Sequence, residues 1–195
     1  IIVNEMANGP VVAFIGSRIF SNNLKINEAD VIRPKAGSTP LAYAQNSTDY
    51  DVQLGGWVIN GGTDTVDADL RAIITFDSTT LYNQISSTVQ LPPSDSAYFS
   101  FPTFSQASYS EGVYNLTYNI DTTGDEFPSD NQVSQNFSIS NSKFSNVPLD
   151  SSGKMNINAF YTTANRSTQT GGAPMSFCSV FKDANASRMA AMGMS

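Results

Sequence analysis

Four carboxylates in one predicted loop are the residues best suited to chemistry. Asp121, Asp125, Glu126 and Asp130 lie within ten residues, between two runs that alternate as strands do. Carboxylate oxygens gathered on one loop are ligands that suit a hard cation such as Ca²⁺. The Asp-x-Asp-x-Asp-Gly spacing of an EF-hand is missing. We expect a loop that either binds Ca²⁺ through these four residues or is a solvated acidic turn.

Catalysis has little support in the chain. It has no histidine and a single cysteine, Cys178, among 195 residues. The commonest general base and the commonest zinc ligand are therefore absent. Cys178 lies in an apolar run, where a small buried side chain is expected more often than a reactive thiol. A glycosidase would need two carboxyls about 5–10 Å apart across a cleft. We expect no enzymatic activity and no catalytic residues.

Charge excludes two classes of partner. Charged residues make up 14% of the chain and the formal net charge is −7. No Lys/Arg stripe exists to neutralise phosphates, so nucleic acid and an anionic membrane surface are not expected partners. Apolar runs stay far below the roughly 18 residues of a membrane span, so no membrane insertion is expected. The chain is rich in Ser, Thr and Asn, and a surface made polar by hydroxyl and amide groups is common in secreted and cell-surface β-proteins.

Short strands are the elements that must position the acidic loop. From Asp49 to Ser140, apolar alternation is broken by turn signals, and no long run has a helical period. This pattern predicts an all-β fold: an Ig-like antiparallel β-sandwich with flanking β-segments. We expect residues 28–140 to form the sandwich. Residues 1–27 would be the tail of a preceding module or an extra layer, and residues 141–195 a partial second β-module.

Aromatic side chains in the expected strands could be core or could stack on sugars. The pair Gly55-Gly56 suggests a β-bulge that re-aims Trp57, and Trp57 is expected to pack in an Ig-type core. Buried aromatics are expected more often than exposed ones in alternating strands, whereas exposed, coplanar rings would favour carbohydrate binding. The other aromatics considered are Tyr98, Phe99, Phe101, Tyr109, Tyr114 and Tyr118.

Several motifs together resemble the CARDB-like bacterial Ig-fold family. They are Asn60-Gly61-Gly62 after a Val/Ile strand, a Pro-Pro-Ser-Asp turn, the run 112–121, and Ser129-Asp130-Asn131-Gln132 before the final strand. The family has Asn-Asn where this chain has Asp130-Asn131. The resemblance covers residues 28–140. It implies a β-sandwich, an extracellular location and an adhesion or spacer role in multidomain surface proteins, and it brings no catalytic residues.

The style of the whole chain resembles large secreted surface proteins of Bacteroidota that are exported by a type IX system. Asp-Ser/Thr followed by a small or aliphatic residue is the O-glycosylation pattern associated with that phylum. The pattern occurs in four predicted turns, so candidate glycosylation sites are Thr65, Ser78, Ser96 and Thr122. Some matches arise by chance in a chain this rich in Asp, Ser and Thr.

These features predict a non-catalytic extracellular module for adhesion, spacing or assembly in a larger bacterial surface or filament-forming protein. Its expected partners are neighbouring modules or identical subunits that pair through β-edges, and glycans are a further candidate. The alternative is a carbohydrate-binding accessory module of a secreted enzyme.

Overall fold

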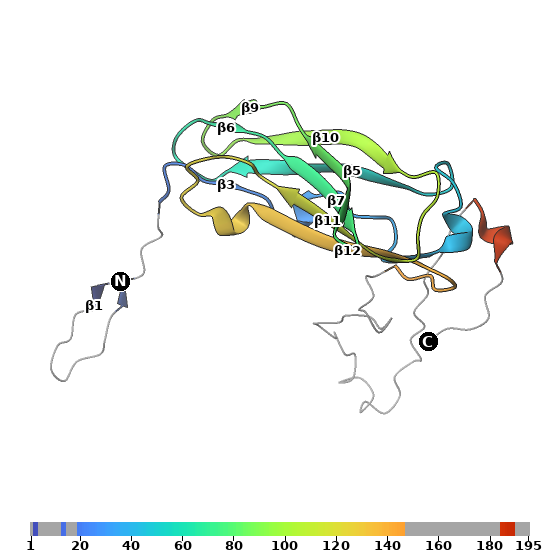
Figure 1. Ribbon diagram of the computed structural model, residues 1–195. Helices are drawn as coiled ribbons and strands as arrows, with labels where there is room; N and C mark the ends of the chain where they lie inside the picture. The colour runs from blue at the N-terminus through green and yellow to red at the C-terminus, as the bar shows by residue number, and fades with distance from the viewer. Residues whose placement is uncertain (1, 4–12, 15–18, 147–183, 190–195) are drawn as a thin grey trace, which may run out of the picture.

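Strands account for most of the regular elements in the part of the chain that the computed structural model describes, residues 2–3, 13–14, 19–146 and 184–189. Two sheets form the body of the fold (Figure 1). The three-stranded sheet has the order β10 (Ser96–Ser105), β5 (Asp51–Asn60), β3 (Leu24–Lys25). The five-stranded sheet has the order β4 (Ser38–Pro40), β12 (Gln132–Ser140), β11 (Gly112–Asn119), β7 (Arg71–Phe76), β8 (Thr79–Ile85).

Smaller elements complete the described residues. Two-stranded pairs are formed by β6 (Val66–Ala68) with β9 (Val89–Leu91) and by β1 (Ile2–Val3) with β2 (Ala13–Phe14). Single 3-10 turns are η1 (Glu28–Asp30), η2 (Leu41–Tyr43), η3 (Pro128–Asp130) and η5 (Ala186–Arg188). No helix among the described residues is long and apolar enough to cross a membrane.

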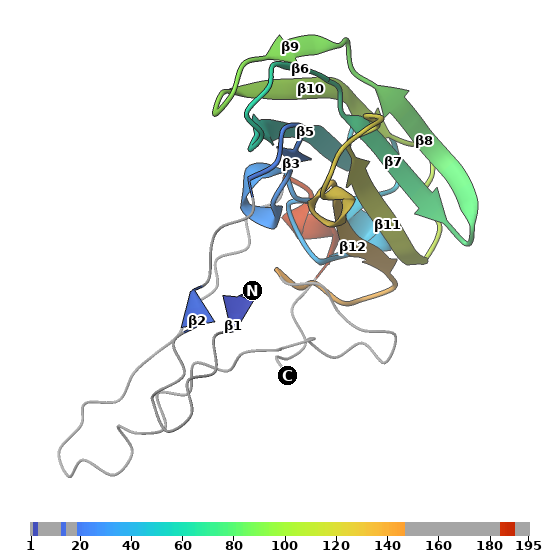
Figure 2. The ribbon, with the colours of Figure 1, turned by 90° about the vertical axis from the view of Figure 1, so that its left-hand side faces the viewer.

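The two sheets face each other as layers, which is clear when the sandwich is viewed from its end (Figure 2). All strand pairs are antiparallel except β4 with β12, which run parallel. The predicted all-β sandwich is therefore confirmed. The sandwich also starts earlier than the expected residue 28, because β3 pairs with the end of β5 and Leu24 is fully buried.

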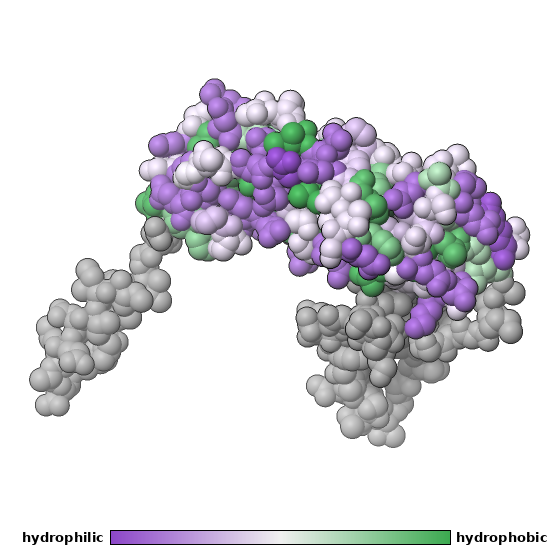
Figure 3. Space-filling model, in the orientation of Figure 1, coloured by the Kyte–Doolittle hydropathy of each residue, from purple (hydrophilic) through white to green (hydrophobic). Residues whose placement is uncertain are grey.

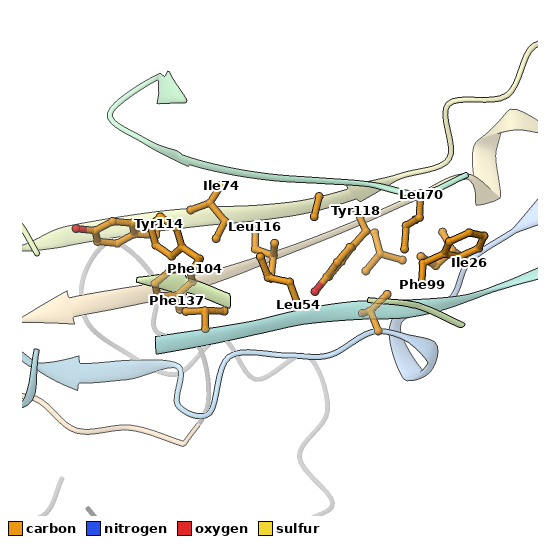
Figure 4. Packing of buried hydrophobic residues seen from close by; sticks show 14 of the residues in the cluster. Ile26, Leu54, Leu70, Ile74, Phe99, Phe104, Tyr114, Leu116, Tyr118 and Phe137 are labelled. Atoms are coloured by element: carbon orange, nitrogen blue, oxygen red, sulfur yellow. The ribbon is translucent and has the colours of Figure 1, made fainter. Parts of the chain in front are cut away.

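The core lies between the sheets and is rich in aromatic rings (Figure 4). On β11, every second residue is buried: Tyr114, Leu116 and Tyr118. Tyr114 stacks on Phe137 of β12 with ring centroids 5.0 Å apart. Its hydroxyl donates to the carbonyl of Ser110 and accepts from the Ser110 N–H, both at 3.0 Å. A tyrosine that bonds the backbone just upstream of its strand is the tyrosine corner of Ig-like sandwiches.

The expected place of Trp57 is wrong. Register between β5 and β10 is unbroken through Gly55 and Gly56, so no bulge changes the phase of β5 there. Even-numbered residues of β5 point inward, and Trp57 stands on the outer face with 46% of its surface exposed. The register shift lies in β10 instead, between Phe101 and Phe104. Phe99, Tyr109, Tyr114 and Tyr118 are buried as expected, whereas Tyr98 is exposed.

The expected second β-module stays a prediction. Most of residues 141–195, including Cys178, lie outside the described residues. Of the described part, Ser145 exchanges backbone hydrogen bonds of 3.0 Å with Ser38 of β4. Arg188 donates to the carbonyl of Ala42 at 3.1 Å and pairs with Asp49.

Candidate functional site

The acidic loop binds the segment that leads into the sandwich, residues 20–26. Asp125 accepts a hydrogen bond of 2.8 Å from the Leu24 N–H and one of 2.7 Å from the Phe127 N–H. Glu126 accepts from the N–H groups of Ser21 at 3.2 Å and Asn22 at 3.4 Å. These two carboxylates therefore serve as acceptors for backbone N–H groups.

The other two carboxylates of the loop have different surroundings. Asp121 forms an ion pair with Arg71 of β7 and accepts a bond of 2.7 Å from the Asn119 amide. The Asp130 carbonyl accepts from the Ile26 N–H at 3.0 Å. Burial foremost raises the pKa of the Asp130 carboxyl, and the neighbouring charge of Asp125 acts in the same direction.

The structure thus divides the four expected Ca²⁺ ligands among separate partners. Within the described ranges there is no group of three or more Asp, Glu, Cys or His side chains that could hold a metal ion. The physical reason is that long-range partners, namely a guanidinium and backbone N–H groups, occupy the carboxylates of Asp121, Asp125 and Glu126. A site made from all four residues does not match this arrangement.

The lead-in segment is also held from its other side by the loop after β5. Gly61 donates to the Asn23 carbonyl at 2.8 Å, and Asp64 donates to the Ser21 carbonyl at 3.0 Å. At Gly62 a Cβ atom would lie 2.5 Å from the Ser21 carbonyl oxygen, so a side chain there would displace the segment. The loop that begins at Asn60-Gly61-Gly62 connects two different sheets, because β5 pairs with β10 and β3 whereas β6 pairs with β9.

An aromatic pair lies on the outer face of the three-stranded sheet. Trp57 on β5 is directly opposite Tyr98 on β10, and their rings are 5.4 Å apart at an interplanar angle of 54°. Both are nearly half exposed, at 46% and 45%. The Tyr98 hydroxyl lies over Gly55, where a Cβ would approach it to 2.4 Å. The pair is thus accessible, and its rings are tilted and not coplanar.

Strand β8 forms an open edge of the five-stranded sheet. It pairs with β7 and has no other neighbour in the sheet order. Its seven residues include no charged side chain, and Ile85 at its end is 48% exposed. Opposite Ile74 and Thr75 the register shifts, which leaves Leu81 as an extra residue in β8. Sequence reasoning missed this strand. The turn before it consists of Asp77 and Ser78, which both have positive φ values, as in a two-residue hairpin turn.

The candidate glycosylation residues lie in loops or at the start of a strand. Thr65, Ser78 and Ser96 are exposed, and Thr122 is half-buried. Accessibility is necessary for modification but does not demonstrate it, so these four sites stay predictions.

The surface offers no large continuous apolar area on the face shown in Figure 3, where hydrophobic residues are scattered among hydrophilic ones. With no histidine in the chain and no metal-ligating cluster in the described part, the distinctive features of the site are surfaces that could pair or bind. They are the β8 edge, the Trp57–Tyr98 pair and the acidic loop.

Comparison with known proteins gives similarities of fold. No family model matches the sequence, and no curated protein matches it. The CARDB domain of a Pyrococcus furiosus protein, solved in complex with di-metal ions, is similar with a TM-score of 0.43 and 18% identity; the similarity covers 64% of this chain and 98% of that domain. A β-glucosidase from Listeria innocua is similar with a TM-score of 0.40 and 7% identity, over 61% of this chain. The chain corresponds to 16% of that enzyme's length.

Proposed function

We propose that this chain is a non-catalytic, extracellular Ig-like module that links copies of itself by pairing at the β8 edge, within a larger surface or filament-forming protein. The composition supports an extracellular setting, since its polarity comes from Ser, Thr and Asn more than from charge. Adhesion or spacing would follow from such links between modules.

The exposed β8 edge carries this proposal. An edge strand presents unpaired backbone N–H and C=O groups to any strand that can lie beside it. Natural proteins often protect such edges with charged residues, and β8 has none among its seven residues. A second copy of β8 would therefore meet no like charge in the strand. The segment from Tyr82 to Ile85, beyond the extra residue Leu81, is the regular part of the edge.

Placing a lysine on this edge tests the proposal. Gln84→Lys would put like charges near each other in any pair of β8 edges, and like charges in an interface cost several kcal/mol. We expect the dissociation constant for self-association to rise about tenfold or more. Sedimentation velocity of the full chain over a range of concentrations measures it.

Asn115→Lys is the matched control, because Asn115 is also exposed but lies on β11, which has a neighbour on each side. It adds the same charge without touching an edge, so its self-association should equal that of the wild type. A wild-type chain that stays monomeric at the highest concentration would refute assembly through β8, as would equal effects of both variants.

A carbohydrate-binding role is the second candidate, and the exposed Trp57–Tyr98 pair favours it. Aromatic rings on an open sheet face can stack on sugar rings, although these two are tilted by 54°. Trp57→Ala should abolish binding on a glycan array. Val113→Ala, which removes a side chain of 45% exposure from the other sheet, should leave it unchanged. Absence of any bound glycan for the wild type would exclude this role.

A further inference from the structure

Residues 184–189, here called the arm, lie against the loop of residues 41–49. The turn η5 of the arm lies beside η2 of the loop, and Figure 1 shows the two turns in red and light blue at one end of the sandwich. The Tyr43 hydroxyl donates to the Ala186 carbonyl at 3.4 Å, across 143 residues of sequence. The contact therefore belongs to the tertiary fold and not to a local turn.

The Arg188 guanidinium binds three acceptors of the loop. Its Nη1 and Nη2 atoms donate to the two carboxylate oxygens of Asp49, and Nη1 also donates to the Ala42 carbonyl at 3.1 Å. An arginine fork that meets both oxygens of a carboxylate is a strong and directional form of ion pair. A lysine would offer one charged nitrogen, which cannot take the places of both Nη atoms. The loop thus presents acceptors in the pattern that a guanidinium fits.

The loop holds the Asp49 carboxylate in place and largely out of solvent. The Asp49 side chain is 7% exposed. The Asn46 Oδ1 atom accepts from the Thr48 N–H at 3.0 Å and from the Asp49 N–H at 3.2 Å, which fixes the turn that carries Asp49. A carboxylate with so little exposure is costly without a cationic partner. Arg188 supplies that partner, and its hydrogen bond is the foremost cause that lowers the pKa of Asp49.

The chain that follows β12 is fastened to the same part of the sandwich. Ser145 exchanges two backbone hydrogen bonds of 3.0 Å with Ser38 of β4. The stretch from Ser145 to Arg188 therefore starts and ends in contact with residues 38–49. Backbone groups make the contact at Ser145, whereas a side chain makes the contact at Arg188, so one substitution can remove the second without touching the first.

We propose that the loop of residues 41–49 is an arginine-binding site whose ligand is Arg188 of the same chain, and that this bond fastens the arm to the sandwich. The chemical class that the site takes is a guanidinium. Loss of the bond should release the arm and leave the sandwich folded, because neither sheet includes a strand of the arm. The site is independent of pairing at β8.

Limited digestion of the full chain with trypsin tests this bond, because the protease must take the arginine side chain into its own pocket. Mass spectrometry measures the rate of cleavage after Arg188. The rate for a free peptide of residues 184–193, divided by this rate, gives a protection factor. We expect Asp49→Asn to lower the factor about tenfold or more, since hydrogen bonds to a charged group are lost and cleavage follows the released population. Arg188→Lys, compared with the matching lysine peptide, should lower it likewise.

Asp51→Asn is the matched control, because it removes the same charge two residues away from Asp49 and its partner is Lys35. Its protection factor should equal that of the wild type. Cleavage after Arg71, inside β7, reports unfolding of the sandwich and should not accelerate in any variant. If Asp49→Asn does unfold, Arg188→Lys decides.

Three results would overturn the proposal. A wild-type chain cleaved after Arg188 as fast as the peptide would show that the arm is not fastened. Unchanged protection in folded Asp49→Asn or in Arg188→Lys would show that the site does not depend on a guanidinium paired with Asp49. Wild-type protection that falls on dilution would place the Arg188 side chain in the loop of another copy.

Discussion

Replacement of Asn60 by alanine is expected to destabilise the fold by about 3–5 kcal/mol. Asn60 ends β5 and is fully buried. Its amide nitrogen donates to the carbonyls of Asp64 at 2.8 Å and Leu91 at 2.9 Å, and its Oδ1 accepts from the Gly62 N–H at 2.8 Å. Alanine would leave three backbone groups without these bonds, and each unsatisfied buried group costs about 1–3 kcal/mol.

Urea unfolding followed by circular dichroism measures this effect as a lower midpoint with an unchanged slope. Asn83→Ala is the control, because Asn83 is exposed on β8 and its amide oxygen accepts a hydrogen bond of 3.0 Å from the Arg71 side chain. It should cost less than about 1 kcal/mol. Equal losses for the two variants would show that Asn60 does not organise the loops around the end of β5.

Replacement of Tyr118 by phenylalanine is expected to cost about 1.5–3 kcal/mol. Tyr118 projects from β11 in the five-stranded sheet, and its hydroxyl accepts from the Gly55 N–H of β5 at 3.1 Å. The same hydroxyl donates to the Ile32 carbonyl at 3.1 Å. One side chain thus joins the two sheets through two hydrogen bonds, and phenylalanine would keep the ring but leave both backbone groups unpaired.

High pH provides an independent test of the burial of the Tyr118 hydroxyl between the sheets. Burial raises the pKa of Tyr118 to about 12, whereas the unfolded value is about 10. The contribution of Tyr118 is therefore fully present below about pH 10 and is lost as pH rises through about 12. The difference in unfolding free energy between wild type and Tyr118→Phe should shrink between about pH 8 and pH 11. A constant difference would contradict the assignment, and Tyr98→Phe, at an exposed ring, should have little effect at either pH.

Strand periodicity predicted those parts of the fold where the alternation is unbroken. The run from residue 113 to 120 shows its buried face directly, as Tyr114, Leu116 and Tyr118 are spaced by two. Trp57 was misplaced because two glycines carry no side chain to show the phase of the strand, and the chain passes through them without a bulge. Strand β8 was missed because its polar, mostly exposed residues give no apolar alternation.

The site could be predicted only in part, because its contacts join distant residues. Sequence pattern identified the acidic loop, but Asp125 and Glu126 bind backbone groups 101 and 105 residues earlier in the chain. No local spacing shows such partners. The burial of Asn23, in the segment that the loop binds, is visible only once the two segments are placed together.

The parallel pairing of β4 with β12 has a mechanical consequence. β4 is an edge strand of the five-stranded sheet, and β12 is the last strand of the sandwich, whereas the first strand, β3, lies at the edge of the other sheet. Tension that reaches the chain just before β4 and just after β12 would pull these two strands in opposite directions along their common axis. Their hydrogen bonds, such as the 2.9 Å bond from the Ser138 N–H to the Gly37 carbonyl, would then be loaded in shear and would have to break together. The β4–β12 pair therefore resists stretching better than a pair of strands that can be peeled apart bond by bond.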